Sequence, residues 1–182
     1  RLHQKICGYI YTELQDIEWE HNGFMNYDRT VKEFGYDYTM INALDFIVLD
    51  HHPGLSFEPG SCLELDIYSS HFSNKNIEQA TLFWRLDGID QLGYEQMNLV
   101  SGSIPISFVQ YKVEKIHQLS ITLPNQPVVG TLHVWVTDQN QAVVARNFIN
   151  VEVFVEPPSI EYSDKNSAIV RLDIGDSPVA EF

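Results

Sequence analysis

Alternation of apolar and polar side chains with a period of two restricts the fold of this chain more than any other feature. Leu63, Leu65 and Ile67 are separated by Glu64 and Asp66, so every second side chain can face a core. Successive side chains of an extended strand point to opposite faces, and the pattern therefore predicts a strand with one buried face. The alternation recurs in five further runs: Leu82, Trp84 and Leu86; Ile104, Ile106 and Phe108; Leu119, Ile121 and Leu123; Leu132, Val134 and Val136; and Ile149, Val151, Val153 and Val155.

These runs predict a mainly β fold class, with an immunoglobulin-like antiparallel β-sandwich over residues 46–155. Turn signals separate the strands, as in Glu58-Pro59-Gly60 and in Asp138-Gln139-Asn140-Gln141. Short alternating strands with turns between them and no helical period are typical of such sandwiches. Trp84 is expected to point into the core.

The flanking stretches differ from this central region. Residues 1–45 begin with a strand-like run from Ile6 to Tyr11, continue into an acidic, aromatic loop and then read as irregular or helical to Leu44. We interpret them as a short α/β excerpt of a larger unit, because they are too few to bury their own apolar residues. Glu156-Pro157-Pro158 ends the central region, since proline does not continue a central strand. Residues 156–182 are then expected to be a linker and the start of a further β module, with a strand over Ala168–Leu172.

Charge restricts the classes of partner. The chain has 25 acidic and 11 basic side chains and a formal net charge of −14. It offers no basic surface to neutralise phosphates, so we expect neither a nucleic acid nor an anionic membrane as a partner. A neutral, hydroxyl-rich ligand such as a carbohydrate is compatible with this charge. Cys7 and Cys62 lack the spacing of a zinc site and are expected to be free thiols. We expect no cofactor. The sequence does not indicate the cellular compartment.

One run of the N-terminal stretch resembles a known family. The matching residues are Gly8-Tyr9-Ile10-Tyr11-Thr12-Glu13-Leu14-Gln15-Asp16-Ile17-Glu18, then His21-Asn22-Gly23-Phe24 and Asn26-Tyr27-Asp28-Arg29. In this order they resemble the last strand and loop of the (β/α)8 barrel in glycoside hydrolase family 2, the β-galactosidase and β-glucuronidase relatives. The region after it is similar to the β-sandwich domain that follows the barrel in those enzymes.

The resemblance implies a division of roles. The parent would be a retaining enzyme, with one glutamate as acid/base and a second as nucleophile about 5–5.5 Å away. In the family, both glutamates lie on earlier barrel strands. This chain would therefore hold no catalytic residue, and its partner would be an upstream barrel domain of the same polypeptide.

The acidic loop supplies the first candidate site. Closely spaced carboxyl groups raise one another's pKa values, but a glycosidase usually takes its two carboxyl groups from separate strands. A solvated acidic loop is therefore the simpler interpretation of Glu13, Asp16 and the acids near them. If this loop lies at the rim of a barrel, then Glu13, Asp16 and Trp19 are candidate substrate-binding residues.

Two aromatic residues supply the second candidate site. The alternation places Phe83 and Trp135 on the outer face of the sandwich, where exposed aromatic side chains mark an interface. Packing against the barrel is the preferred interpretation, and a glycan platform is the alternative. His51 and His52 would point to opposite faces of a strand, so we expect no shared metal ion.

Three hypotheses about function follow. The chain is a non-catalytic structural and interface module of a glycoside hydrolase, an independent carbohydrate-binding module, or an immunoglobulin-like protein-interaction domain. The first explains the run from Gly8 to Arg29, and the third leaves it unexplained.

Overall fold

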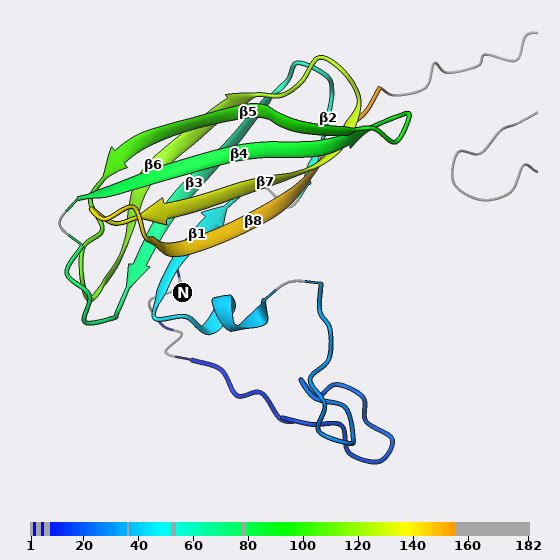
Figure 1. Ribbon diagram of the computed structural model, residues 1–182, viewed down its shortest axis with the longest axis vertical. Coiled ribbons are helices and arrows are strands. Elements are labelled where there is room, and N and C mark those ends of the chain that lie inside the picture. The colour runs from blue at the N-terminus through cyan, green and yellow to red at the C-terminus, as the bar shows by residue number, and fades with distance from the viewer. Residues whose placement is uncertain are drawn as a thin grey trace, which may run out of the picture.

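The protein is described here by a computed structural model, which covers residues 2, 5, 8–35, 37–51, 54–77 and 79–155 (Figure 1). It is mainly β, with two sheets and one short 3₁₀-helix within these residues. The elements, in chain order, are η1 (Tyr38–Asn42), β1 (Asp45–Asp50), β2 (Ser56–Phe57), β3 (Cys62–His71), β4 (Ala80–Asp90), β5 (Glu95–Ile106), β6 (Lys112–Thr122), β7 (Val128–Thr137) and β8 (Val143–Val153). We refer to residues 45–153 as the β body.

The two sheets have simple orders. One has three strands in the order β1-β3-β6, and the other has five in the order β2-β8-β7-β4-β5. All pairings within them are antiparallel except that of the two-residue β2 with β8, which is parallel. Figure 1 shows the three-stranded sheet behind the five-stranded one, with η1 below β8.

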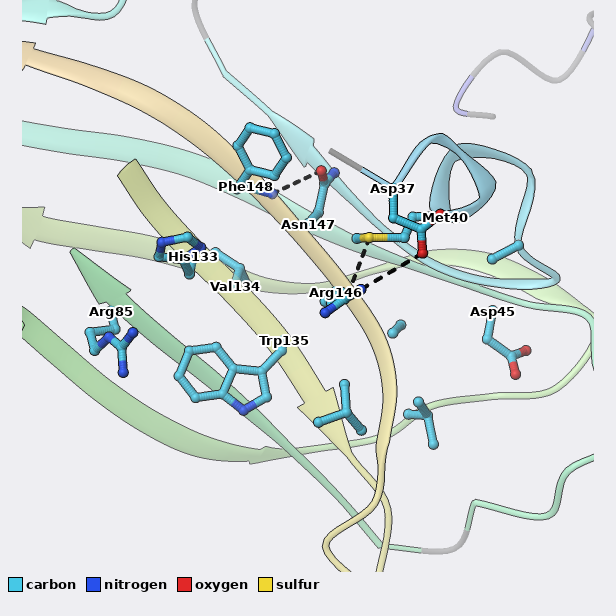
Figure 2. Close-up of a pocket in the computed structure, with 14 residues that line it drawn as sticks. Asp37, Met40, Asp45, Arg85, His133, Val134, Trp135, Arg146, Asn147 and Phe148 are labelled. Carbon is cyan, nitrogen blue, oxygen red and sulfur yellow. Dashed lines mark hydrogen bonds and ion pairs between the residues drawn. The ribbon is translucent and has the colours of Figure 1, made fainter. Parts of the chain in front are cut away.

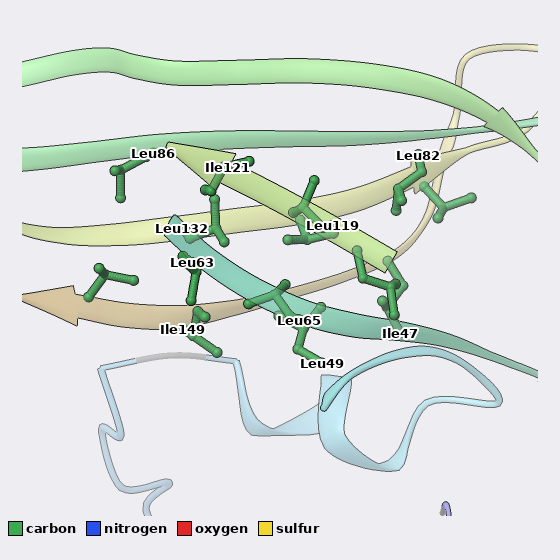
Figure 3. Close-up of a cluster of buried hydrophobic side chains, with 14 of the residues drawn as sticks. Ile47, Leu49, Leu63, Leu65, Leu82, Leu86, Leu119, Ile121, Leu132 and Ile149 are labelled. Atoms are coloured by element: carbon green, nitrogen blue, oxygen red, sulfur yellow. The ribbon is translucent and has the colours of Figure 1, made fainter. Parts of the chain in front are cut away.

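The predicted alternation forms the core of the β body (Figure 3). Leu63, Leu65 and Ile67 on β3 are buried, and so are Leu82 and Leu86 on β4. The other predicted core residues that are buried are Phe108, Leu119, Ile121, Leu123, Leu132, Val134, Val136, Ile149, Val151 and Val153. Each buried side chain of this kind contributes about 1.5–3 kcal/mol relative to exposure. Both sheets contribute to one cluster, so the pattern correctly predicted which face of each strand is apolar.

Trp84 packs against this core, as predicted, and needs a glycine beside it. Its cross-strand partner on β5 is Gly102. A Cβ atom at position 102 would lie far inside van der Waals contact with the indole ring. The same ring stacks on the imidazole of His117 from β6, at a centroid distance of 6.4 Å.

The structure corrects two predictions about strands. Val155 is 61% exposed and lies beyond the end of β8, because the β7 ladder stops where Val128 pairs with Val153. Gly8–Tyr11 is not part of a strand, and no strand neighbour supplies a ladder for it within the described residues. Ile6, Cys7 and the predicted strand Ala168–Leu172 lie outside the described residues.

A buried polar contact ties the start of β1 to the end of β3. Nδ1 of His71 lies 2.7 Å from Oδ1 of Asp45, and Nε2 lies 3.1 Å from the carbonyl oxygen of Lys75. Both side chains are almost fully buried. An ionised carboxylate only accepts hydrogen bonds, so Nδ1 of His71 is the donor in its contact with Asp45. The backbone N–H of Ser73 also donates to Asp45, at 3.2 Å.

Candidate functional site

The N-terminal loop is organised around the carboxylate of Asp16, which is only 4% exposed. Lys32 Nζ donates to Oδ1 of Asp16 at 2.6 Å, and the backbone N–H of Gly23 donates to the same oxygen at 3.0 Å. His21 Nδ1 lies 3.4 Å from Oδ2. The hydrogen bond from Lys32 is the largest effect on the pKa of Asp16, which lies below its ordinary value although burial opposes this. The carboxylate therefore acts within the chain, as the centre that holds this loop together.

Gly23 is required by this arrangement. A Cβ atom at position 23 would lie within 3 Å of the backbone of Gln15 and Asp16. Only a residue without a side chain brings the two segments of the loop this close.

The other predicted residues of the loop have different surroundings. A hydrogen bond with the carboxyl group of Glu20 is the main cause that raises the pKa of Glu13, and burial and nearby negative charge act in the same direction. Trp19 lies on a turn between Ile17 and Glu20 and is 91% exposed. The structure thus places Glu13 and Asp16 in one loop and leaves the Trp19 ring in solvent. Their contact with a substrate remains a prediction.

Many apolar side chains of residues 8–32 face solvent. Ile10 and Trp19 are each 91% exposed. The others that are at least half exposed are Tyr9, Leu14, Ile17, Tyr27 and Val31. A concentration of exposed apolar side chains on one short segment is typical of a surface that is covered by a partner.

The second predicted pair, Phe83 and Trp135, lies on the outer face of the five-stranded sheet. The two residues are cross-strand partners on β4 and β7. Their rings are stacked, with centroids 5.4 Å apart and planes inclined by 8°. Both are partly buried, and the outward orientation that the alternation predicted is confirmed.

A groove of about 790 Å³ lies between this sheet face and the segment that contains η1 (Figure 2). Trp135 and His133 from β7 line it, together with Arg85 from β4 and Arg146 from β8. The remaining lining residues are Asp37, Met40, Ala43, Asp45, Val134, Val143, Val144, Ala145, Asn147 and Phe148. We call this cavity the Trp135 groove.

Arg146 joins the two walls of the Trp135 groove. Its guanidinium lies 3.8 Å from the carboxylate of Asp37, and its Nε lies 3.2 Å from Sδ of Met40. These dashed contacts in Figure 2 hold the η1 segment against β8. On the other side, Arg85 is paired with Asp87, with Nη2 at 2.7 Å from Oδ2. Sequence reasoning missed this groove, because residues 37 and 146 are brought together only by the fold.

Among the described residues, no three His, Cys, Asp or Glu side chains converge in a way that would hold a metal ion. His52 lies outside the described residues, so the pair with His51 is not placed. The described part of the chain contains no helix with the length and apolar character needed to cross a membrane. Cys62 is a free thiol, whereas Cys7 lies outside the described residues.

Comparisons with known proteins give weak structural similarities. No family model and no curated protein matches the sequence. The alkylpurine DNA glycosylase AlkC of Pseudomonas fluorescens matches over 64% of this chain and 32% of its own, with 14% identity and a TM-score of 0.40. The sporulation control protein Spo0M of Bacillus subtilis matches over 63% and 51%, with 13% identity and a TM-score of 0.38. A conjugative transposon lipoprotein of Bacteroides eggerthii matches over 59% and 96%, with 9% identity and a TM-score of 0.36.

The chain thus spans about a third of the first of these proteins and about half of the second. Similarities at this level assign neither a family nor a function. The fold and the sites define a mainly β, two-sheet protein with an aromatic and polar groove on one sheet face.

Proposed function

We propose that this chain is a non-catalytic structural and interface module of a retaining glycoside hydrolase that acts on β-glycosides. In this proposal, the β body is the immunoglobulin-like β-sandwich that follows the barrel, and the run from Gly8 to Arg29 is the last barrel strand and loop. The order of unlike residues in that run supports the proposal.

The observation that carries the proposal is the exposure of apolar side chains on a loop with its own internal order. Asp16, Lys32 and Gly23 hold the loop in one conformation. Burial of a side chain such as Ile10 or Trp19 would contribute about 1.5–3 kcal/mol, and the loop leaves both of them in solvent. An adjoining barrel would supply the missing cover, and neighbouring barrel strands would supply a ladder for Gly8–Tyr11.

The geometry of the acidic loop favours a role outside catalysis. The carboxyl group of Glu20 raises the pKa of Glu13, so the two carboxyl groups are neighbours within this loop. Retaining glycosidases keep their two carboxyl groups about 5–5.5 Å apart, with the scissile bond between them. Glu13 and Glu20, in contrast, both come from one local segment rather than from two separate strands.

The proposal gives the predicted loop residues distinct roles. Asp16 positions the loop from inside it. Glu13 and Trp19 would lie at the rim of the barrel, where side chains that follow a strand contact substrate.

An activity comparison tests the proposal. This chain and the longer polypeptide with its upstream barrel are incubated with chromogenic aryl β-glycosides, and the anomeric configuration of the first product is followed by NMR. We expect turnover with retention by the longer polypeptide and none by this chain. Hydrolysis by this chain alone would overturn the non-catalytic role. A longer polypeptide that is inactive on all substrates, or that inverts the anomeric centre, would overturn the assignment to a retaining hydrolase.

A further inference from the structure

We propose that the Trp135 groove is a carbohydrate-binding site for a neutral glycan, with one pyranose ring packed against the indole of Trp135. The inference does not depend on the proposed hydrolase function, because all of the residues that form the groove belong to this chain.

The aromatic wall is the first support. Trp135 lines the groove, and Phe83 stacks on it with nearly parallel planes but does not line the groove itself. Phe83 therefore fixes the orientation of the indole from outside the cavity. A pyranose presents a face of C–H groups, and the negative face of an aromatic ring attracts such groups. A ring that is held in place before binding also loses little side-chain entropy on binding.

The polar lining is the second support. Arg85 uses Nε and Nη2 in its contacts with Asp87, at 2.8 and 2.7 Å. A guanidinium has five N–H donors, so Arg85 retains three that these two contacts do not use. His133 is the cross-strand neighbour of Arg85, and its side chain is 45% exposed on the same face. It offers a ring nitrogen to a ligand there. Sugar hydroxyl groups both donate and accept hydrogen bonds, and they match such a mixed lining.

Charge balance selects a neutral ligand. Two arginines, Arg85 and Arg146, and two aspartates, Asp37 and Asp45, line the groove. The lining is therefore formally balanced, while the chain as a whole carries a net charge of −14 and repels polyanions. The volume of about 790 Å³ lies within the range of about 300–1,000 Å³ that is typical of small-molecule sites.

Affinity electrophoresis of the whole chain tests this inference. Native gels contain mixed-linkage β-glucan, xyloglucan, galactan or galactomannan, with bovine albumin as a non-binding reference. We expect at least one of these neutral polysaccharides to retard the chain. Trp135→Ala should lower the association constant about tenfold, the loss of roughly one aromatic contact. Trp135→Phe should bind more tightly than Trp135→Ala because it retains a ring.

The matched control is Tyr94→Ala, which removes an aromatic side chain that is 66% exposed and does not line the groove. It should bind as the unmodified chain does. Arg85→Gln provides a second variant if Trp135→Ala does not fold, and it should also weaken binding. Near-ultraviolet circular dichroism verifies the fold of each variant.

Three results would overturn the inference. The first is that no polysaccharide retards the chain, as expected if a protein surface occupies the groove. The second is that Trp135→Ala and Tyr94→Ala lower the association constant equally. The third is that a carboxymethylated form of the retarding polysaccharide binds equally well or more tightly. None of them involves glycoside hydrolysis, so failure here is separate from failure of the proposed function.

Discussion

Replacement of Asp45 by alanine should strongly destabilise the β body, because it removes the acceptor of a buried contact. The carboxylate accepts from Nδ1 of His71 at 2.7 Å and from the backbone N–H of Ser73 at 3.2 Å. Alanine leaves the buried Nδ1 donor of His71 and the backbone N–H of Ser73 without their acceptor. A buried donor that is left unsatisfied costs about 1–3 kcal/mol. The two lost hydrogen bonds to the Asp45 carboxylate, at about 1.5–3 kcal/mol each, give a total loss of about 3–6 kcal/mol.

Urea unfolding at pH 7, followed by tryptophan fluorescence, measures this effect. With a denaturant slope of about 1–3 kcal/mol/M, the midpoint should fall by about 1 M or more. Asp66→Ala is the matched control, because Asp66 pairs with Lys115 at 2.6 Å while both side chains are at least 30% exposed. Exposed pairs of this kind contribute about 0–1 kcal/mol. Equal destabilisation by the two substitutions, or a loss below about 1 kcal/mol for Asp45→Ala, would refute the reasoning.

Three further predictions follow from the structure. Burial raises the pKa of Asp45, but the hydrogen bonds from His71 and Ser73 outweigh burial and lower that pKa overall. The ionised carboxylate of Asp45 therefore stabilises the fold fully above its unfolded-state pKa of about 3.9. This stabilisation is lost as the pH falls through the lower pKa of the folded state. Asp45→Asn should lack this acid-dependent loss in unfolding experiments between pH 2 and 6. Lys32→Met removes the ammonium group that is paired with the Asp16 carboxylate and should loosen the loop, so limited proteolysis within residues 14–32 should become several-fold faster. Lys115→Met removes an exposed pair with Asp66 and should leave the rate of this proteolysis unchanged. Gly102→Ala forces a methyl group against Trp84 and should cost about 1–3 kcal/mol in thermal unfolding, whereas Gly8→Ala, with nothing within 4 Å, should cost far less.

The faces of the long strands were predictable from the sequence because burial follows a local rule. Every second residue of an extended strand meets the same environment, so Leu63 and Leu65 reveal their face without knowledge of their neighbours. The same rule correctly placed Phe83 and Trp135 outside. It failed at Val155, where the alternation continues but the ladder with β7 has ended.

Other features depend on partners that lie far along the chain. β1 was not predicted, because Asp45–Asp50 is short and begins and ends with aspartate. Asp45, the first residue of β1, is buried because the β1–β3 register places it opposite His71. A single sequence does not show which strands are neighbours, and a buried carboxylate therefore looks the same as a solvated one.

The same limit applies to the candidate sites. The resemblance of residues 8–29 identified the acidic loop as a candidate, but only the fold showed that Asp16 is engaged by Lys32. The alternation placed Trp135 on the outer face, but the register of β7 with β4 and β8 put Phe83 on one side of it and Arg146 on the other. The sequence by itself determined the mainly β class and the apolar face of each long strand, because these depend on spacing along the chain. The tertiary structure alone decided the groove and the buried contact between Asp45 and His71, because both consist of side chains that meet only through strand register.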